Sequence, residues 1–335
     1  MKLAKYFSII VFSSIFFYGV PGFYLLPLAT YQGDLTRIGL LPESEFGWRL
    51  PQPQLENRFF RQSSFQEADV LVIGDSFSLS LVWQTILNKN NLKVHTEHWE
   101  NVGGVCSNFM DWLQRQNFKG KYIIFESIER NLVSNIDKSL SCANVLYKKD
   151  ARSIPEGIGS APPVSFNTQS GDYSGRLSSG IRTQLNLIKY KVLSRSDHFQ
   201  SMSLANDTTL VRMKDGCKLY SHKSCSDSLF LNEGTEDIEE STITKIQLIN
   251  TRLSGITPIW AIVPNKSTAY LFPSKLFWNH LEQTIHAPNL LQMTQDAINQ
   301  QVVDLYPANN THFSTRGYLL MGDAIYKTLR DSSPK

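Results

Sequence analysis

The chain has 335 residues, a formal net charge of +3 at pH 7 and 41% hydrophobic residues. This is an ordinary globular composition, long enough for one large domain or two smaller ones. A net charge so close to zero argues against the strongly basic proteins that bind nucleic acids, and no nucleic-acid partner is expected.

The first predicted element is an apolar helix at the N-terminus. Lys2 and Lys5 precede a long uncharged run, as in a signal peptide or a signal anchor. The run is about long enough to span a bilayer, although Pro21 and Gly22 would bend or shorten its helix. Residues 1–30 are therefore predicted to be a signal anchor, with a cleaved signal peptide as the alternative. A retained anchor makes the chain a single-pass protein of the cell inner membrane, with its domain on the periplasmic side.

Four cysteines, an even number, fit this oxidising compartment. Cys217 and Cys225 bracket a short segment that predicts a small disulfide-closed loop, and Cys106 would then pair with Cys142. The sequence alone does not choose among the possible connectivities. A zinc site is disfavoured because no second close pair of Cys or His accompanies these cysteines, and no metal or cofactor is expected.

Beyond the anchor, residues 31–67 are rich in Pro, Gln, Arg and Glu and predict a stalk. Several of the apolar or β-branched runs that follow are near-continuous, as in strands covered on both faces. These runs lie at 70–74, 93–99, 121–127, 258–264 and 301–306. Helical patterns lie between or after them at 78–90, 108–116, about 241–254 and 315–330. The alternation predicts an α/β domain over 68–335 with about five parallel strands and helices on both sides.

The alternation fails between about residues 135 and 240, where Gly, Pro and Ser are frequent. Only a helix near 180–195 is predicted there. Long loops within a compact domain are usually functional or disordered. The segment is therefore predicted to be a loop-rich insertion that covers or borders the active face.

The stretch "ADVLVIGDSFSLSLVWQTIL" (68–87) places Ser76 directly after the first predicted strand. Ligands of open α/β sheets bind beyond the carboxyl ends of the strands. Backbone N–H groups at a helix start can also hold an oxyanion. Ser76 is therefore a candidate nucleophile. The alternative is that Ser76 or Ser78 only caps the helix.

A serine nucleophile needs a base, and the chain has seven histidines. His312 follows the last predicted strand and precedes the final helix, which Ser314 can cap, so His312 is expected at the same sheet edge as Ser76. His95 and His98 lie in a predicted strand without the helical H-E-x-x-H spacing of a zinc protease. They are expected to be packed or surface histidines.

These residues carry a family resemblance. "IGDSFS" and a His just before a C-terminal helix resemble the SGNH (GDSL-like) hydrolases. "FESIERNL" (125–132), "PNKSTAY" (264–270) and "NTHFS" (310–314) are similar to the SGNH-hydrolase-like domain of alginate O-acetylation proteins of the AlgX/AlgJ type. The resemblance covers roughly residues 68 to 330 and implies a three-layer, flavodoxin-like α/β fold.

The resemblance also implies roles at the site. Ser76 matches the nucleophile and His312 the general base, while Asp75 shapes the turn. Gly103 or Gly104 would offer an N–H to the oxyanion; the alternative is a simple turn.

Outside the catalytic pair, the resemblance adds three candidates for substrate binding. Arg130 matches an "E-R" pair with Glu129, and its role is contact with an anionic sugar, positioning of the catalytic loop, or a structural ion pair. Lys266 and Tyr270 match the "P-x-K-x-x-x-Y" stretch, and their role is open.

The sequence departs from the family pattern in two ways. The His follows the serine, as in ordinary SGNH hydrolases, whereas in the alginate proteins it precedes the serine. An acidic residue is also expected two or three positions before His312, where Asn310 and Asn309 stand. Asn can hold an imidazole tautomer but cannot stabilise an imidazolium, and Asp-to-Asn replacement in a serine protease triad costs about 10⁴-fold in turnover. Asp304 is a further acid nearby in the sequence.

The function implied is O-acetyl transfer to an exported polysaccharide through an acetyl-serine intermediate. The partner implied is a membrane-bound acyltransferase that supplies the acyl group, because acetyl-CoA is absent outside the cytoplasm. The alternatives are a periplasmic carbohydrate or acyl esterase, and a catalytically impaired glycan-binding or assembly protein of the same fold.

Overall fold

The computed structural model describes residues 2–149, 152, 154, 156–166, 172–173, 176–233, 238–273 and 276–332. The chain forms two compact units. The first unit comprises residues 1–51, 165–232 and 306–311, and the second comprises 52–164, 233–305 and 312–335. Each has its own cluster of buried apolar side chains.

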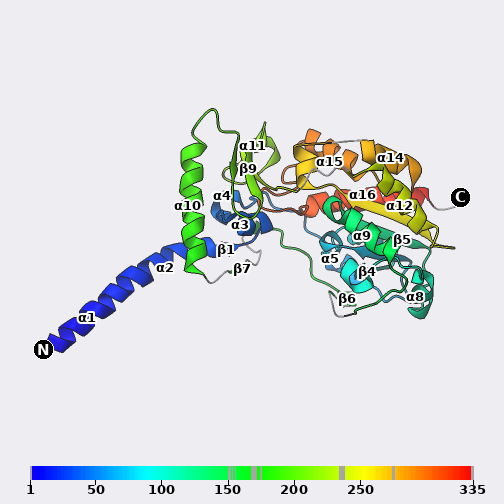
Figure 1. The fold of residues 1–335 in the computed structure, drawn as a ribbon, viewed down its shortest axis with the longest axis horizontal. Helices are drawn as coiled ribbons and strands as arrows, with labels where there is room; N and C mark the ends of the chain where they lie inside the picture. The colour runs from blue at the N-terminus through cyan, green and yellow to red at the C-terminus, as the bar shows by residue number, and fades with distance from the viewer. Residues whose placement is uncertain are drawn as a thin grey trace. The chain divides into compact units, whose positions relative to one another are not determined.

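The second unit is built on a parallel four-stranded sheet in the order β11-β5-β3-β4. Figure 1 labels its strands β4 and β5. Its strands are β3 (Val70–Gly74), β4 (Val94–His98), β5 (Tyr122–Ile128) and β11 (Thr257–Val263). All five residues of β3 are buried, which explains why its sequence is a continuous apolar run. The predicted mixed α/β architecture with parallel strands is thus confirmed.

Helices cover both faces of this sheet. Apolar residues of α8, α9, α12 and α14 form one cluster with Leu71, Ile73 and Phe125, whereas α6 and α16 contact each other and the strands β4 and β11. The longer helices of the unit are α6 (Gln84–Lys89), α8 (Phe109–Arg115), α9 (Glu129–Ser141), α12 (Glu240–Asn250), α14 (Leu276–Thr284), α15 (Leu290–Asn299) and α16 (Thr315–Asp331). Its short helical turns are η3 (Asn57–Phe59), α5 (Ser76–Leu79), α7 (Trp99–Val102) and α13 (Lys266–Tyr270).

The prediction of a fifth strand at 301–306 is wrong. Gln301 and Asp304 have positive φ angles of 57° and 56°, and a left-handed residue cannot continue an extended strand. The segment instead forms turns between α15 and α16. Its buried apolar residues, such as Leu305, produced the strand-like pattern.

The first unit contains an antiparallel three-stranded sheet in the order β10-β9-β8. Its strands are β8 (Ser201–Ser203), β9 (Thr208–Arg212) and β10 (Asp227–Leu231). The helices with it are α3 (Asp34–Gly39), α4 (Glu43–Phe46), α10 (Leu177–Leu193) and α11 (Gly216–Leu219). Leu35, Phe46, Leu187 and Leu210 lie in its core.

This unit differs from the predicted layout of stalk and insertion. Part of the stretch 31–67 forms α3 and α4, and their Leu35 and Phe46 are fully buried. Residues 201–231, expected to be loop, form the antiparallel sheet. Two short ribbons also form: β1 (Thr30–Tyr31) with β7 (Asp172–Tyr173) in this unit, and β2 (Arg61–Gln62) with β6 (Gly157–Ile158) in the second unit.

The N-terminal segment is helical but interrupted. It consists of α1 (Lys2–Ser14), a π-helical turn η1 (Ile15–Gly19), α2 (Val20–Leu25) and a 3₁₀ turn η2 (Pro27–Ala29). Pro21 lies in the first turn of α2, where a missing N–H is tolerated. None of the helices within the described residues reaches the length and apolarity that a membrane span requires.

Both disulfides of the favoured connectivity are present and thus confirmed. Cys217 is bonded to Cys225, and Cys106 is bonded to Cys142. The first closes a small loop in the first unit. The second ties the segment before α8 to the end of α9 in the second unit.

Candidate active site

The site lies where the strand order of the second unit reverses. The chain leaves β3 toward β4 on one side and later adds β5 and β11 on the other. The carboxyl ends of β3 and β4 lie side by side, because Gly74 pairs with His98. Such a switch point is the usual ligand-binding position of an open parallel sheet. Ser76, two residues after the end of β3, lies at this edge.

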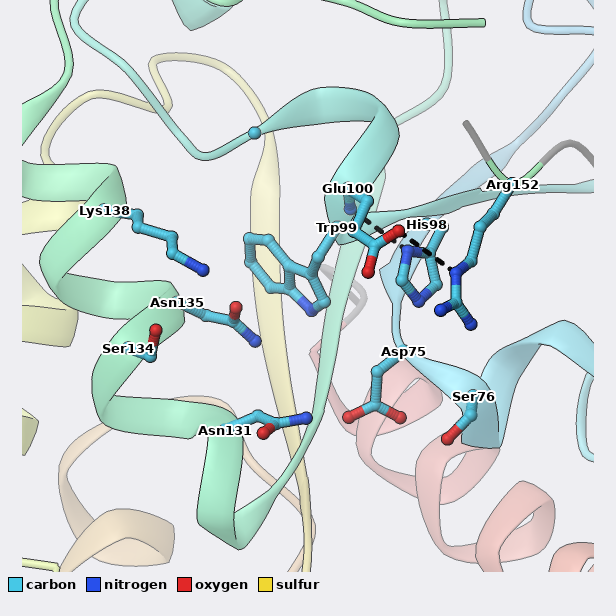
Figure 2. A pocket seen from close by; sticks show the side chains of 11 residues that line it. Asp75, Ser76, His98, Trp99, Glu100, Asn131, Ser134, Asn135, Lys138 and Arg152 are labelled. Carbon is cyan, nitrogen blue, oxygen red and sulfur yellow. Dashed lines mark hydrogen bonds and ion pairs between the residues drawn. The ribbon is translucent and has the colours of Figure 1, made fainter. Parts of the chain in front are cut away.

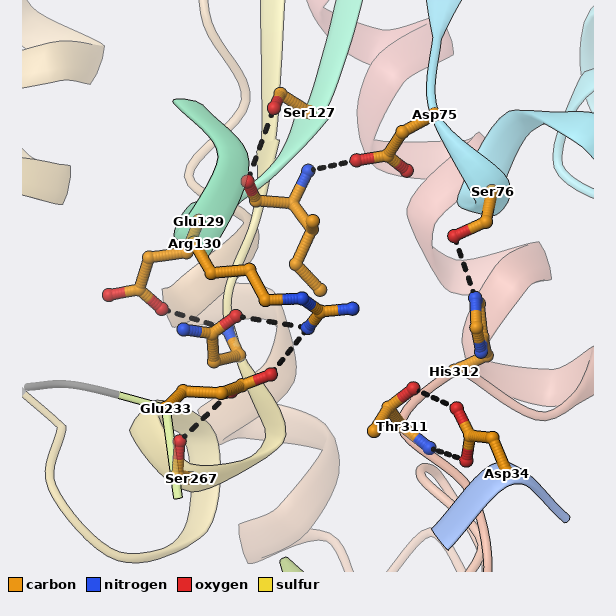
Figure 3. A network of polar contacts seen from close by, with 12 residues as sticks. Asp34, Asp75, Ser76, Ser127, Glu129, Arg130, Glu233, Ser267, Thr311 and His312 are labelled. Carbon is orange, nitrogen blue, oxygen red and sulfur yellow. Dashed lines mark hydrogen bonds and ion pairs between the residues drawn. The ribbon is translucent and has the colours of Figure 1, made fainter. Parts of the chain in front are cut away.

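The turn that carries Ser76 is fixed by Asp75, which is the N-cap of α5. One Asp75 carboxylate oxygen accepts a hydrogen bond from the N–H of Phe77 at 3.0 Å. The other accepts one from the N–H of Ile128, at the end of β5, at 2.7 Å (Figure 3). Ser78 instead donates to the Glu126 carboxyl at 2.6 Å. Neither Ser76 nor Ser78 is therefore needed as the cap.

Beneath this turn lies the buried carboxyl of Glu126. It accepts hydrogen bonds from the Asp75 N–H at 3.0 Å and from the Ser78 hydroxyl. A Cβ at Gly74 would collide with Ser78 Oγ and Glu126 Oε2, so only glycine fits there. Complete burial, and next the charge of Asp75, raise the pKa of Glu126 well above its usual range. The turn therefore rests on a carboxyl that favours its neutral form.

Glu126→Gln tests this assignment through stability. A folded pKa above the unfolded value means that the wild type has its full stability below the unfolded pKa. It loses stability as the pH rises toward the folded pKa. Glu126→Gln lacks this loss. The free energy of unfolding of the variant, relative to that of the wild type, should therefore rise from about pH 4 to neutral pH, by about 1.4 kcal/mol per unit of pKa shift. Urea unfolding across this range measures it, with exposed Glu67→Gln as the control. If the free energy of unfolding changed with pH equally in Glu126→Gln and in the wild type, the raised pKa of Glu126 would be contradicted.

Ser76 and His312 are in direct contact. The Ser76 hydroxyl lies 2.8 Å from Nε2 of His312, and the imidazole edge points at the hydroxyl (Figure 3). The half-buried His312 ring packs against Phe77 with a centroid distance of 4.8 Å. Ser314 caps α16 two residues later, as predicted, and accepts from the N–H of Gly317. Residues separated by 236 positions are thus held in the geometry of a nucleophile and its base.

In the first unit, the two asparagines before His312 are held by other groups. The Asn309 amide donates to Glu43 at 2.8 Å, and the Asn309 carbonyl accepts from the N–H of Leu35. The Asn310 N–H donates to the carbonyl of Pro307. The expectation that Asn309 replaces the triad acid receives no support from these contacts.

A carboxylate that the sequence did not predict binds the residue next to His312 in the chain. The carboxylate of Asp34, also in the first unit, accepts from the Thr311 N–H at 2.8 Å and from the Thr311 hydroxyl (Figure 3). Thr311 directly precedes His312. Asp34 lies 277 positions earlier in the chain, so no local motif could have identified it.

A cavity of about 570 Å³ opens beside Ser76 within the second unit (Figure 2). Its lining comes from segments that follow three of the sheet strands. The residues are Asp75, Ser76, His98, Trp99, Glu100, Gly103, Asn131, Ser134, Asn135, Lys138 and Arg152. The volume is that of an ordinary small-ligand site.

One wall of the cavity is a polar face of α9. Asn131, Asn135 and Lys138 stand at positions i, i+4 and i+7, and Figure 2 shows them directed from α9 into the cavity. Their spacing along a helix that follows a predicted strand was the available sequence signal.

The opposite wall carries His98, Glu100 and Arg152. Arg152 forms an ion pair with Glu100 at 3.1 Å, and His98 Nδ1 accepts from the Glu100 N–H at the start of α7. Burial lowers the pKa of His98, and the charge of Arg152 lowers it further. His98 is therefore a neutral cap, packed as predicted, and it also lines the cavity.

The two candidate oxyanion glycines differ. Gly103 has φ +79°, lines the cavity and has open space where a Cβ would project, but its N–H donates to the carbonyl of Trp99 at 2.7 Å. Gly104 packs against the backbone of Ser139. The Asn131 side chain, which was not among the predicted site residues, offers an amide N–H inside the cavity.

The three predicted substrate-binding residues do not line this cavity. Arg130 forms an ion pair with Glu233 and a weaker hydrogen bond with Asn265 (Figure 3). Burial raises the pKa of Glu233, although the Arg130 charge acts in the opposite direction. Lys266 is buried and Tyr270 half-buried in α13. Of the alternatives for Arg130, the ion pair is the one observed.

Comparisons with known proteins identify no relative: no protein-family model, no curated protein and no solved structure matches the chain. Over the described residues, His, Cys, Asp and Glu nowhere gather in a group of three or more able to hold a metal ion.

Proposed function

We propose that this chain is a serine-dependent O-acyltransferase of the SGNH-hydrolase type, which acetylates an exported polysaccharide. The observation that carries the proposal is the 2.8 Å contact between Ser76 Oγ and His312 Nε2, beside a polar cavity at a sheet switch point. A serine hydroxyl in contact with a neutral imidazole is the starting state for acyl transfer.

In the first half-reaction, His312 Nε2 removes the Ser76 proton as Oγ attacks the acyl carbonyl of the donor. The bond to the leaving group then breaks, and the leaving group takes the proton from His312. The product is an acyl ester on Ser76. In the second half-reaction, a sugar hydroxyl gives its proton to His312 and attacks that ester. Ser76 recovers the proton, and the sugar carries the acyl group.

The negative charge that develops on the carbonyl oxygen needs N–H donors. The backbone at the start of α5 and the Asn131 amide are the candidates. Gly103 donates within its own turn, and Gly104 packs against Ser139 and is not part of the cavity lining. Removal of a side-chain oxyanion donor in a serine protease costs about 10²–10³-fold in turnover. Such donors would stabilise the oxyanion in both half-reactions.

The cavity has the chemistry of a glycan site. Trp99 offers an aromatic surface, and Asn131, Ser134 and Asn135 offer hydrogen-bonding groups to sugar hydroxyls. Lys138 adds positive charge for an acidic sugar, whereas the charge of Arg152 is paired with Glu100. The donor is then an acyl group carried by a membrane-bound acyltransferase. The apolar N-terminal segment would keep the chain at the inner membrane, with its sheet unit on the periplasmic side.

The test uses the full chain and p-nitrophenyl acetate as an activated donor. We expect release of p-nitrophenol and an acetyl group on Ser76, detected by mass spectrometry of the peptide that contains it. Addition of an acidic oligosaccharide should then move the acetyl group to the sugar. Transfer to water alone would identify an esterase. The absence of both p-nitrophenol release and acetyl-Ser76 would contradict every enzyme assignment and favour a glycan-binding role.

A further inference from the structure

Helix α10 of the first unit has an ordinary buried face. Gly180, Thr183, Leu187 and Tyr190 are its buried residues. Leu187 and Tyr190 belong to the core of that unit. The spacing i, i+3, i+7, i+10 defines one side of the helix. This side accounts for the packing of α10.

A second apolar face lies nearly opposite, about 150° around the helix at 3.6 residues per turn. Ile181, Leu185, Ile188 and Val192 occupy positions i, i+4, i+7 and i+11, and they are 42%, 59%, 50% and 64% exposed. We call these four residues the exposed stripe. A contiguous apolar surface of this kind on a soluble unit usually marks an interaction site.

Basic residues accompany the exposed stripe. Arg182 and Lys189 lie along one edge of it, and Arg195 follows the C-terminal end of the helix. Within the described residues none of these three has an acidic partner. No Asp or Glu occurs from residue 176 to residue 195. A helix with an apolar face bordered by Lys and Arg is the pattern of a helix that lies in the interface of a bilayer.

The apolar N-terminal segment meets the same helix. Gly180 of α10 is so close to the carbonyl of Leu25, at the end of α2, that a Cβ would collide with it. Phe23 and Tyr24 of α2 are 78% and 70% exposed. Within the first unit, an exposed apolar segment therefore joins the helix that carries the exposed stripe (Figure 1).

We propose that the exposed stripe of α10 binds the surface of an anionic lipid bilayer. The four apolar side chains enter the acyl–headgroup boundary, and Arg182, Lys189 and Arg195 contact lipid phosphates. The charge favours a bilayer over a protein partner: three basic residues beside the stripe, with no Asp or Glu from residue 176 to residue 195, match anionic headgroups. A second copy of this helix would place like charges opposite each other. The surface is independent of the catalytic assignment.

The test is photocrosslinking of the full chain, with benzoylphenylalanine in place of Leu185. The protein is reconstituted into phosphatidylcholine vesicles with or without phosphatidylglycerol. We expect lipid adducts at position 185 that are several-fold more abundant with phosphatidylglycerol. In the Arg182→Gln/Lys189→Gln background they should fall about tenfold or more, since each cation near an anionic surface contributes about fivefold to binding. The matched charge control is Arg115→Gln/Lys119→Gln, two exposed cations of the second unit.

The same photoprobe at Leu248, an exposed leucine of α12 (53% exposed), should give few lipid adducts. Crosslinks from position 185 to another copy of the chain, in place of lipid, would overturn the proposal in favour of an oligomer interface. Equal lipid labelling at 185 and 248, or no loss in the Arg182→Gln/Lys189→Gln background, would overturn it as well.

Discussion

Ser76→Ala is expected to lower turnover of the acetyl ester by about 10⁴-fold or more and to abolish the acetyl-enzyme. The only change is the loss of one hydroxyl, which lies 2.8 Å from His312. Asp75 caps α5 and bonds to Ile128, so the turn keeps its supports without Ser76. Binding of the acceptor sugar should therefore persist, because the other cavity residues are unchanged. Ester turnover and acceptor binding by calorimetry measure the two effects.

The double variant Ser76→Ala/His312→Ala tests whether the two residues act together. A nucleophile and its base act as one unit, so removing both should cost about as much as removing one. Ser80→Ala is the matched control: it removes an exposed hydroxyl near the end of the same turn and should leave turnover unchanged. The two residues would not form a catalytic pair if the loss of turnover in the double variant equalled the product of the two single-variant losses. An active Ser76→Ala protein would show the same.

The strands of the parallel sheet could be predicted because each is buried on both faces. The run 70–74 coincides with β3, and 93–99, 121–127 and 258–264 agree with β4, β5 and β11 within a residue or two. The same reasoning failed at 301–306, because burial alone does not distinguish a strand from a buried turn. Only the left-handed backbone at Gln301 and Asp304 does so.

The antiparallel sheet of the first unit could not be predicted for the opposite reason. Its strands β8, β9 and β10 are short and contain serines and threonines, and the surrounding segment is rich in loop-forming residues. Their core is completed by Leu35 and Phe46 from a segment more than a hundred residues earlier. Short sequence patterns carry no information about packing between segments so far apart in the chain.

At the candidate site, the sequence could place Ser76 after a strand and predict His312 as its partner, and the two are in contact. The reason given for His312 was wrong in part, because the run before it at 301–306 forms turns and not a strand. The cavity wall on α9 was not predicted, because no helix was expected at 129–141 and the loop-rich insertion was placed from about residue 135. The role of Asp34 could not be predicted, because an acid was expected only near the histidine, at Asn309, Asn310 or Asp304. A carboxylate can act from any part of the chain that the fold brings near, and local sequence does not reveal which.

Asp34→Ala is expected to lower turnover about 100-fold and to leave acceptor binding unchanged. Asp34 accepts two hydrogen bonds from Thr311, and Thr311 is joined to His312 by a peptide bond. Without the carboxylate, the Thr311 backbone is released, and with it the backbone of the base. Displacement of a catalytic group by about 1 Å can cost about 10²-fold. We infer that Asp34 acts as a positioning residue through its two hydrogen bonds from Thr311.

Graded variants distinguish this role from a general loss of folding. Asp34→Asn keeps a carbonyl oxygen for one of the two Thr311 donors and should lose less activity than Asp34→Ala. Thr311→Val keeps the backbone N–H bond and should also lose less. Asp197→Ala, an exposed acid of the same unit, is the matched control and should retain full turnover. If Asp34→Ala turns over acetyl ester at the wild-type rate while remaining folded, His312 does not depend on this carboxylate. The base would then be oriented by the half-buried packing of its ring against Phe77.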